Sequence, residues 1–355
     1  MSRSNAAESG GPSLTLVQQL DARDFLPLAL RHGALNVASL GLYGFWGRSE
    51  SRRRLWAATD MNGEPLDYGG LGVELMIGAL AKLVVVGAAL LAAVAAIQGF
   101  GIWGAPAALV AAASVTLFLG FCRFVGFVYL ATRTEWRGQV FEVDGSSATF
   151  ALGELRDAAI SVLTLGWWRP AADRRRDAAL WGGLRHPHRP AAYDAAAAAR
   201  RPLYSAFAIG WFGTVMIALF AAGVLLGLAA GLVPTIAIGT GPSVGLLAGL
   251  ISLALSLWPP LVLAWAPYQA ARRSATAAGL GLALPLRRRA WARLQATNTA
   301  LRIVSLGALT PYATARESAF VFSRLEEARR LSRRTRAARR LAAVAFAPVE
   351  AKAGA

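Results

Sequence analysis

VELMIGALAKLVVVGAALLAAVAAI, residues 73–97, is the stretch that decides the fold of this 355-residue chain. An α-helix needs about 20 mostly apolar residues to cross the hydrocarbon core of a bilayer, where no water can satisfy the backbone. Three further stretches meet the same test, namely 106–131, 204–232 and 243–266. The sequence therefore predicts an integral membrane protein with four spanning helices.

The composition agrees with a fold that is solvated by lipid. Hydrophobic residues make up 55% of the chain and charged residues only 16%, which is too apolar for a pair of soluble domains. A net charge of +17 would by itself suggest nucleic acid or an anionic surface as a partner. The basic residues lie in blocks between the apolar stretches, however, so we expect no nucleic-acid partner.

The distribution of charge predicts the topology. The first two spans are joined by QGFGIWGAP and the last two by VPTIAIGTGP, and neither turn contains Lys or Arg. The segments on the other side, 47–70, 132–203 and 269–355, carry four, eleven and seventeen basic residues. Because basic residues near span ends stay in the cytoplasm, we expect two hairpins in a bacterial inner membrane, with both termini cytoplasmic.

A weakly similar motif occurs before, between and after the two hairpins, at 35–56, 159–181 and 300–322. Each copy has a short apolar helix, a Leu-Gly break, an aromatic or Pro-containing turn, and an Arg-rich helix that ends in an aromatic residue. Superposing the Leu-Gly pairs aligns the three copies without gaps, which indicates an internal repeat. The residues that mark the motif are Gly41, Tyr43, Trp46 and Trp56, then Gly166, Trp168 and Trp181, then Asn298, Gly307 and Tyr312.

The apolar part of each copy is only about a dozen residues long, which is typical of a re-entrant or interfacial helix. If 150–168 crossed once, the basic segment 169–203 would lie on the opposite side from 48–70, against the charge distribution. Polar residues such as Glu154 and Asp157 raise the cost of a crossing. We therefore expect three partial elements, although a helical pair that crosses twice would satisfy the same charge distribution.

The predicted fold is an all-α integral membrane protein, in which two transmembrane hairpins alternate with three pseudo-repeated re-entrant or interfacial motifs. A disordered N-terminal tail is expected over 1–23, a membrane domain over 24–325 and a basic C-terminal tail over 326–355. Inside the membrane domain, the successive parts are motif 24–70, hairpin 73–131, motif 137–201, hairpin 204–268 and motif 290–325.

The first copy of the motif carries a resemblance to a known family. Its Ser-Leu-Gly break, the turn with Tyr43, Trp46 and Arg48, the Arg-rich helix, and Thr59-Asp60-Met61-Asn62-Gly63 followed by a Tyr resemble the YjgN-like bacterial inner-membrane proteins. RGQVFEVDGSSATF (137–150) and Asn298-Thr299 extend the likeness, which covers about 24–325. The Tyr-x-x-Trp-x-Arg pattern is whole only in the first copy, so three equivalent sites are not implied. The family is a domain of unknown function, and the resemblance implies a location without an activity.

Two basic residues inside the predicted spans are candidates for binding. Lys82 and Arg123 lie at similar depth on adjacent helices, and charge inside a bilayer is costly enough to suggest a function. Together they could hold an anionic head group or substrate, with Glu74 as a counter-charge nearer the cytoplasm. Alternatively, both side chains snorkel to the cytoplasmic interface.

The arginine clusters offer a second kind of site. Arg48, Arg52 and Arg53 in the first copy, together with 174–176 and 287–289, could recognise anionic lipid. The same charges could also serve only to anchor the topology. We expect anionic membrane lipids as partners, and the sequence leaves oligomerisation open.

The sequence offers no catalytic or metal motif. It has no Gly-x-Ser-x-Gly, no P-loop and no Gly-x-Gly-x-x-Gly after a strand. Cys122 is the single cysteine, and His186-Pro187-His188 has no Cys or carboxylate beside it. The proline predicts an exposed loop there, so we expect no metal, no cofactor and no catalytic residue.

The leading functional hypothesis is a non-enzymatic membrane protein that binds or translocates a small anionic or lipid-like ligand at the cytoplasmic side. One alternative is a scaffold that organises anionic lipid without transport. A lipid-acting enzyme is a further alternative, which the shortage of histidines and of paired carboxylates disfavours.

Overall fold

The computed structural model describes residues 14–188, 193–237 and 244–345, without the side chains of 228–255 and 329–345. The chain is mostly helical. Two stretches of the described chain are long and apolar enough to cross a membrane, 72–132 and 204–227.

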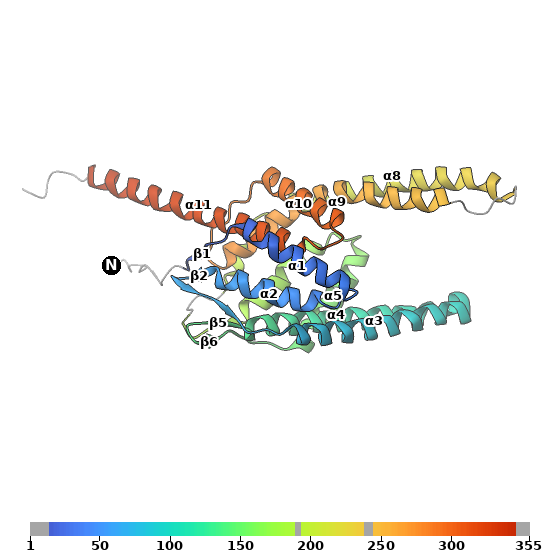
Figure 1. The fold of residues 1–355 in the computed structure, drawn as a ribbon, viewed down its shortest axis with the longest axis horizontal. Helices are drawn as coiled ribbons and strands as arrows, with labels where there is room; N and C mark the ends of the chain where they lie inside the picture. The colour runs from blue at the N-terminus through green and yellow to red at the C-terminus, as the bar shows by residue number, and fades with distance from the viewer. Residues whose placement is uncertain (1–13, 189–192, 238–243, 346–355) are drawn as a thin grey trace, which may run out of the picture.

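The apolar helices form two arms that extend in the same direction from the rest of the molecule (Figure 1). Arm 1 consists of α3 (Gly72–Phe100), the 3-10 turn η2 (Gly101–Gly104) and α4 (Ala105–Thr132); arm 2 consists of α8 (Tyr204–Ala237) and α9 (Val244–Gly279). The two helices of each arm pack side by side. None of the residues in the most apolar window of arm 1 is buried, as expected for a surface that faces lipid.

Three helical pairs accompany the arms. They are pair 1, α1 (Phe25–Ala38) and α2 (Gly44–Ala57); pair 2, α5 (Ser147–Leu163) and α6 (Arg169–Gly182); and pair 3, α10 (Arg288–Val304) and α11 (Thr310–Ala345). In pairs 1 and 3 the turn between the helices lies on the side of the arm tips (Figure 1). A short helix, α7 (Ala195–Ala199), precedes arm 2.

The same Leu-Gly turn joins the helices of each pair. Both residues have positive φ, with values of 52° and 93° for Leu40-Gly41, 49° and 89° for Leu165-Gly166, and 48° and 87° for Leu306-Gly307. Each Gly N–H donates to a carbonyl five residues earlier, at N···O distances of 2.7, 2.6 and 2.7 Å. A left-handed Gly that returns a hydrogen bond to the preceding turn is a common way to end a helix.

A hydroxyl before each Leu-Gly pair fixes the start of the second helix. Ser39 accepts a hydrogen bond from the backbone N–H of Tyr43 at 2.8 Å. Thr164 and Ser305 accept equivalent bonds from Trp168 and Leu309, at 3.1 and 3.0 Å. Such side-chain acceptors satisfy N–H groups that the first turn of a helix leaves free. The predicted break at Gly41, Gly166 and Gly307 is thus present in all three pairs.

The prediction of an all-helical chain was wrong in one respect, because three small antiparallel sheets join the helices. They comprise β1 (Leu16–Gln18), β2 (Thr59–Met61) and β3 (Glu64–Pro65); β4 (Asp67–Tyr68), β5 (Thr134–Trp136) and β6 (Gln139–Val140); and β7 (Glu142–Val143) and β8 (Leu184–Arg185). Asn62-Gly63 and Arg137-Gly138 form the hairpin turns, with positive φ at both residues. This conformation matches the twist of two-residue hairpins.

Part of the predicted N-terminal tail is ordered. Leu16 pairs with Met61 in the first sheet, and η1 (Ala22–Asp24) leads into α1. The prediction of disorder over 1–23 was therefore wrong for its last residues, and 1–13 lie outside the described residues. At the other end, α11 continues to Ala345 and extends away from the arms (Figure 1). The remainder of the predicted basic tail, 346–355, also lies outside the described residues.

Several small apolar clusters hold the elements together. Phe25 opens the first helix of pair 1, packing with Leu55 and Ala315. At the same position of the other pairs, Phe150 packs against Phe124 of arm 1, and Trp291 packs against Ala266 and Ala270 of arm 2. These aromatic anchors attach pair 2 to arm 1 and pair 3 to arm 2.

Candidate functional site

Pair 2 contains four buried carboxylates. Glu154 and Asp157 lie on α5, and Asp173 and Asp177 lie on α6, with exposed fractions between 0 and 8%. Burying a charge costs free energy unless an opposite charge and hydrogen bonds compensate for it. All four carboxylates have arginine partners, and we call this set the ion-pair network.

The ion-pair network attaches pair 2 to arm 1. Arg123 on α4 forms an ion pair with Glu154, which also accepts hydrogen bonds from Nε and Nη2 of Arg176, both at 2.9 Å. Gly120 lets α4 approach α5 closely, because a Cβ there would lie only 3.0 Å from the Cα of Ala151. Arg123 therefore has a carboxylate partner within the protein.

The ion-pair network also attaches pair 2 to arm 2. Arg272 on α9 donates to Asp177 at 2.7 Å and lies 3.3 Å from a carboxylate oxygen of Asp173. The hydroxyl of Tyr268 donates to Asp173 at 2.7 Å, and that of Thr276 donates to Asp177 at 2.9 Å. Pair 2 is thus bonded to both arms through one continuous set of charges.

The protonation states in this region are fixed by their neighbours. Burial raises the pKa of Tyr268, and the charge of Asp173 raises it further, so the phenol stays neutral and donates. Burial alone would lower the pKa of Arg272, but hydrogen bonding to Asp177 and the charge of Asp173 raise it above its usual value. Both features favour a permanent structural connection.

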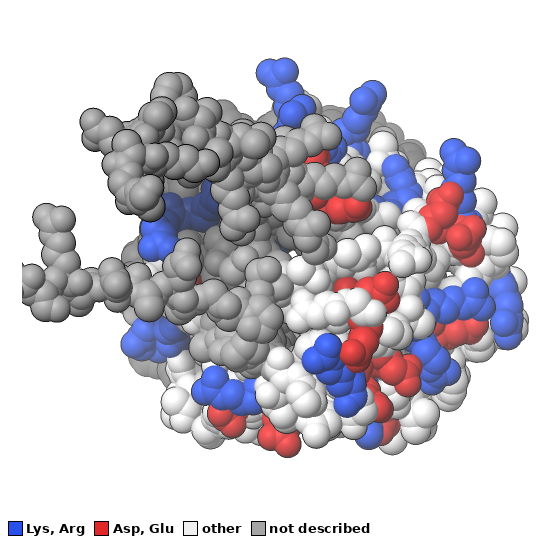
Figure 2. All heavy atoms as spheres, turned by 90° about the vertical axis from the view of Figure 1, so that its left-hand side faces the viewer, with Lys and Arg blue, Asp and Glu red and all other residues white. Residues whose placement is uncertain are grey.

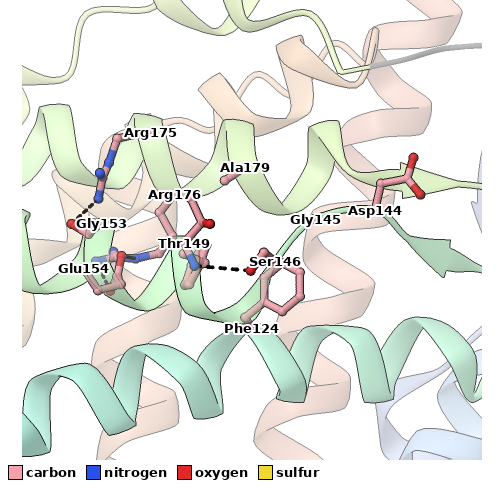
Figure 3. A pocket seen from close by; sticks show the side chains of 11 residues that line it. Phe124, Asp144, Gly145, Ser146, Thr149, Gly153, Glu154, Arg175, Arg176 and Ala179 are labelled. Carbon is pink, nitrogen blue, oxygen red and sulfur yellow. Dashed lines mark hydrogen bonds and ion pairs between the residues drawn. The ribbon is translucent and has the colours of Figure 1, made fainter.

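Two pockets flank Glu154. One, of about 270 Å³, lies between α4, α5 and α6; in Figure 3, Arg175 and Arg176 reach down from α6 while Phe124 closes the floor. The other, of about 370 Å³, is lined by Arg123 and Arg169 among others. The charged groups that line both pockets are neutralised by one another or by nearby partners, as Arg175 is by Asp157. Neither pocket presents unpaired positive charge.

The three helical pairs place a polar contact at the same two positions. Eight residues before the Leu of the turn stand His32, Asp157 and Asn298, each 4% exposed or less. Their partners on the second helix are Glu50 at 2.8 Å, Arg175, and Arg316 at 2.8 Å. Pair 1 alone has the basic residue on the first helix and the carboxylate on the second.

A third pocket, of about 360 Å³, lies between pair 1 and pair 3, and we call it the groove. It follows one face of α2 and is closed on the far side by the start of α11. Gly33 permits the close approach of α1 to the turn of pair 3, because a Cβ there would lie 2.6 Å from the Cβ of Ala308. The residues of α2 that line the groove are Gly44, Gly47, Arg48, Ser51, Arg52 and Leu55.

Arg48 and Arg52 give the groove an uncompensated positive charge. They stand four residues apart on α2, and like charges at that spacing repel each other. The guanidinium of Arg48 lies over the Phe45 ring at 5.8 Å, and Arg52 donates to the hydroxyl of Tyr68 at 3.2 Å. No carboxylate lines the groove, and neither arginine forms an ion pair within the described part of the chain. The groove is therefore suited to an anion.

Two buried polar atoms on the groove wall have no hydrogen-bond partner among the described residues, Nδ1 of His32 and Oδ1 of Asn36. The other ring nitrogen of His32 lies 2.8 Å from Glu50. Burial raises the pKa of the Glu50 carboxyl, but the hydrogen bond to His32 and the charges of His32, Arg31 and Arg54 lower it more, leaving it below its usual value. Buried polar atoms without partners are uncommon in proteins.

The structure separates the other candidate residues from the groove. Lys82 is exposed on α3 and makes no ion pair with any described residue. Glu74 forms an ion pair with Arg133 and accepts a hydrogen bond from Tyr129 at 2.8 Å, at the base of arm 1. Arg53 is exposed outside the groove, its Nε 3.5 Å from the carbonyl of Tyr68. Of the six predicted binding residues, only Arg48 and Arg52 share a pocket.

Most motif aromatics and Asn298 hold helices together. Trp56 donates to Thr134 at 2.9 Å, Trp168 donates to Asp157 at 3.0 Å, and Trp181 packs against Phe127 with ring centres 5.3 Å apart. Trp46 lies against Gly72 at the start of α3. Asn298 donates to the carbonyl of Ala313 at 3.1 Å, and the ring of Tyr312 lies 5.8 Å from the guanidinium of Arg316.

Sequence reasoning missed His32 on the groove wall. The gapless alignment of the Leu-Gly pairs already placed it over Asp157 and Asn298, and that correspondence was the available signal. The exposed loop predicted at 186–188 is present at Pro187 and His188, which are exposed, but the imidazole of His186 is buried between Trp136 and Phe141.

The comparisons with known proteins give one match. A family model with the description "Bacterial protein of unknown function (DUF898)" matches residues 20–343. No curated protein and no solved structure matches the chain. The matched range includes both arms, the helical pairs and the residues of the groove. The chain therefore belongs to the DUF898 family, the YjgN-like bacterial proteins.

Proposed function

We propose that this protein is a non-enzymatic inner-membrane protein that binds a small anionic or lipid-like ligand in the groove, at the cytoplasmic side. The observation that carries the proposal is the pair of arginines, Arg48 and Arg52, which share a pocket wall without a carboxylate among its described residues. An anion that bridged two guanidinium groups would relieve their repulsion and accept charge-assisted hydrogen bonds.

The arrangement of polarity supports the membrane placement. The arms form the apolar end of the molecule, whereas the opposite end presents Arg interspersed with Asp and Glu (Figure 2). In the proposal, the arms cross the bilayer as four spans, and β1 and the end of α11 face the cytoplasm. This placement puts the basic segments on the side that the distribution of positive charge requires.

The helical pairs support a re-entrant role. The Leu residues of the three turns are almost entirely exposed, at 95% for Leu40, 75% for Leu165 and 94% for Leu306. Moving an exposed leucine side chain from water into lipid lowers the free energy, because it removes apolar surface from water. We therefore propose that the pairs are three related units that dip into the inner leaflet.

In the scaffold alternative, the arginine clusters bind the head groups of anionic lipids. Two members of the second cluster, Arg175 and Arg176, form ion pairs with Asp157 and Glu154 inside pair 2. Such arginines are not free to hold lipid head groups. Arg287, Arg288 and Arg289 are exposed, so lipid anchoring in pair 3 is compatible with ligand binding in the groove.

The proposal is tested by mass spectrometry of molecules that copurify with the protein in a mild neutral detergent. Wild-type protein and Arg53→Gln should both retain an anionic species at near-stoichiometric amounts, because Arg53 lies outside the groove. The double variant Arg48→Gln/Arg52→Gln should lose it. Retention by the double variant, or the absence of any anionic species from wild type, would contradict the proposal.

A further inference from the structure

We infer that the ligand of the groove is an anionic amphiphile, whose head group is held by Arg48 and Arg52 and whose hydrocarbon chain leaves the groove beside the Leu-Gly turns of pairs 1 and 3. The inference rests on the proposed function and adds the chemical class of the ligand. Three features of the groove support it: its length, its gradient of charge, and the environment of His32.

The groove is longer than a small anion requires. Its α2 wall runs from Gly44 to Leu55, which at a rise of about 1.5 Å per residue corresponds to roughly 16 Å. Arg48 and Arg52 occupy the middle of this wall. A compact anion would contact the two guanidinium groups and leave the ends of the groove unfilled.

Formal charge falls from the middle of the groove toward the turns. Beyond Arg48, the turn end is lined by the small residues Gly44, Gly307 and Ala308 and by the uncharged side chains of Asn36 and Thr310. Next to them in the chain stand Leu40 and Leu306, whose side chains are almost fully exposed. An apolar tail that passes over the small residues would cover these leucines and remove apolar surface from water or from the head-group region.

His32 supplies a further contact for a polar head group. Its unpartnered Nδ1 is buried against Gly47, where a Cβ would lie 3.1 Å away, so no side chain at Gly47 separates this atom from the groove. In the neutral ring, with the Nε2 proton directed to Glu50, Nδ1 accepts a hydrogen bond from a hydroxyl of the head group. In the protonated ring it donates to the anion.

The test compares inorganic phosphate with dodecyl phosphate as probes, using the full chain in phosphatidylcholine nanodiscs and empty nanodiscs as the partition control. Wild-type protein should bind dodecyl phosphate at least about tenfold more tightly than inorganic phosphate. Butyl and octyl phosphate should fall between them in order of chain length. Arg48→Gln/Arg52→Gln should weaken dodecyl phosphate binding by about tenfold or more, through loss of charge-assisted hydrogen bonds.

The turn leucines provide matched variants. Leu40→Asn/Leu306→Asn should weaken dodecyl phosphate binding about fivefold through loss of apolar contact with the tail, and should leave phosphate binding unchanged. The turns should keep their conformation, because asparagine tolerates positive φ. Leu165→Asn, in the same backbone conformation in pair 2, should change neither probe.

The outcomes separate the inference from the proposed function. Equal affinity for phosphate and all alkyl phosphates, with both still weakened by the arginine substitutions, would overturn the amphiphile and leave anion binding intact. If Arg48→Gln/Arg52→Gln leaves the affinity for every probe unchanged, both the inference and the proposed function are overturned. The chain-length series uses wild-type protein, so the inference can fail even if a leucine variant does not fold.

Discussion

His32 and Glu50 meet at a position where pair 2 joins Asp157 to Arg175 and pair 3 joins Asn298 to Arg316. An arginine stays charged at every pH that a cell encounters. Of these three contacts, the one on the wall of the groove joins an imidazole to a carboxylate, and the other two contain an arginine.

At the residue scale, the lowered pKa of Glu50 predicts an acid-dependent loss of stability. A carboxylate whose pKa is lower in the folded chain stabilises the fold above its unfolded pKa, and this contribution disappears as the pH falls through the folded value. The melting temperature of wild type should therefore fall in acid more than that of Glu50→Gln, measured between about pH 6 and pH 3. Glu64→Gln, an exposed carboxylate on β3, should behave as wild type. Parallel curves for wild type and Glu50→Gln would refute the assignment.

The Leu-Gly turn gives a second residue-scale prediction. Gly166 has a φ of 89°, where a Cβ is strained, so Gly166→Ala should lower the free energy of unfolding by about 1–2 kcal/mol. Leu165→Gly removes a side chain from a left-handed position and should not destabilise the chain to that extent. Denaturant titration of the two variants measures the difference in the free energy of unfolding. An equal loss of stability at both positions would show that φ does not determine the conformation of the turn.

At the element scale, the ion-pair network decides how pair 2 holds the two arms. Its arginines come from α4, α6 and α9, and its carboxylates come from α5 and α6. Sequence patterns found the arms and the Leu-Gly breaks, because apolar length and a glycine after leucine are local signals. The short sheets were missed since strands of two or three residues have no readable periodicity, although Asn62-Gly63 was a recognisable hairpin signal.

Asp173 is the network member whose removal should be most damaging. It is fully buried and bonds Arg176, Tyr268 and Arg272 together. Asp173→Asn would leave Arg176 and Arg272 with one carboxylate partner each, Glu154 and Asp177, in a buried network, and we expect a loss of about 3 kcal/mol in the free energy of unfolding.

Asp144→Asn is the matched control for this substitution, because Asp144 is largely exposed and pairs with Arg185 on the surface. Its cost should stay below about 1 kcal/mol. Thermal unfolding and limited proteolysis report both variants. Equal stability of Asp173→Asn and Asp144→Asn would contradict the view that the network connects the arms to pair 2.

At the scale of the whole molecule, the groove could not be predicted because its walls come from opposite ends of the chain. Arg48 and Thr314 line the same cavity, and no local pattern reports a contact between them. The sequence did single out Arg48 and Arg52, but only as members of a charge cluster. It could not distinguish them from Arg53, which the helix turns away from the groove.

Membrane orientation is testable on the intact protein. In a Cys122→Ser background, Trp103→Cys at the exposed tip of arm 1 should react with an impermeant maleimide added outside the inner membrane. Glu142→Cys, at an exposed position of β7, should react only after permeabilisation, because basic segments stay in the cytoplasm. The reverse pattern of labelling would invert the proposed topology.

The connection of Asp173 to Tyr268 also has a consequence for biosynthesis. The two residues are 95 positions apart, and a ribosome that adds about 5–20 residues per second needs roughly 5–20 s to cover that distance. Arg272 and Tyr268 are therefore still unmade when the second helical pair leaves the ribosome. During that interval Asp173 and Asp177 must rely on their own helix and on solvent. Arm 1 and pair 2 can associate early, whereas the final closure of the core waits for the last apolar helix to be translated.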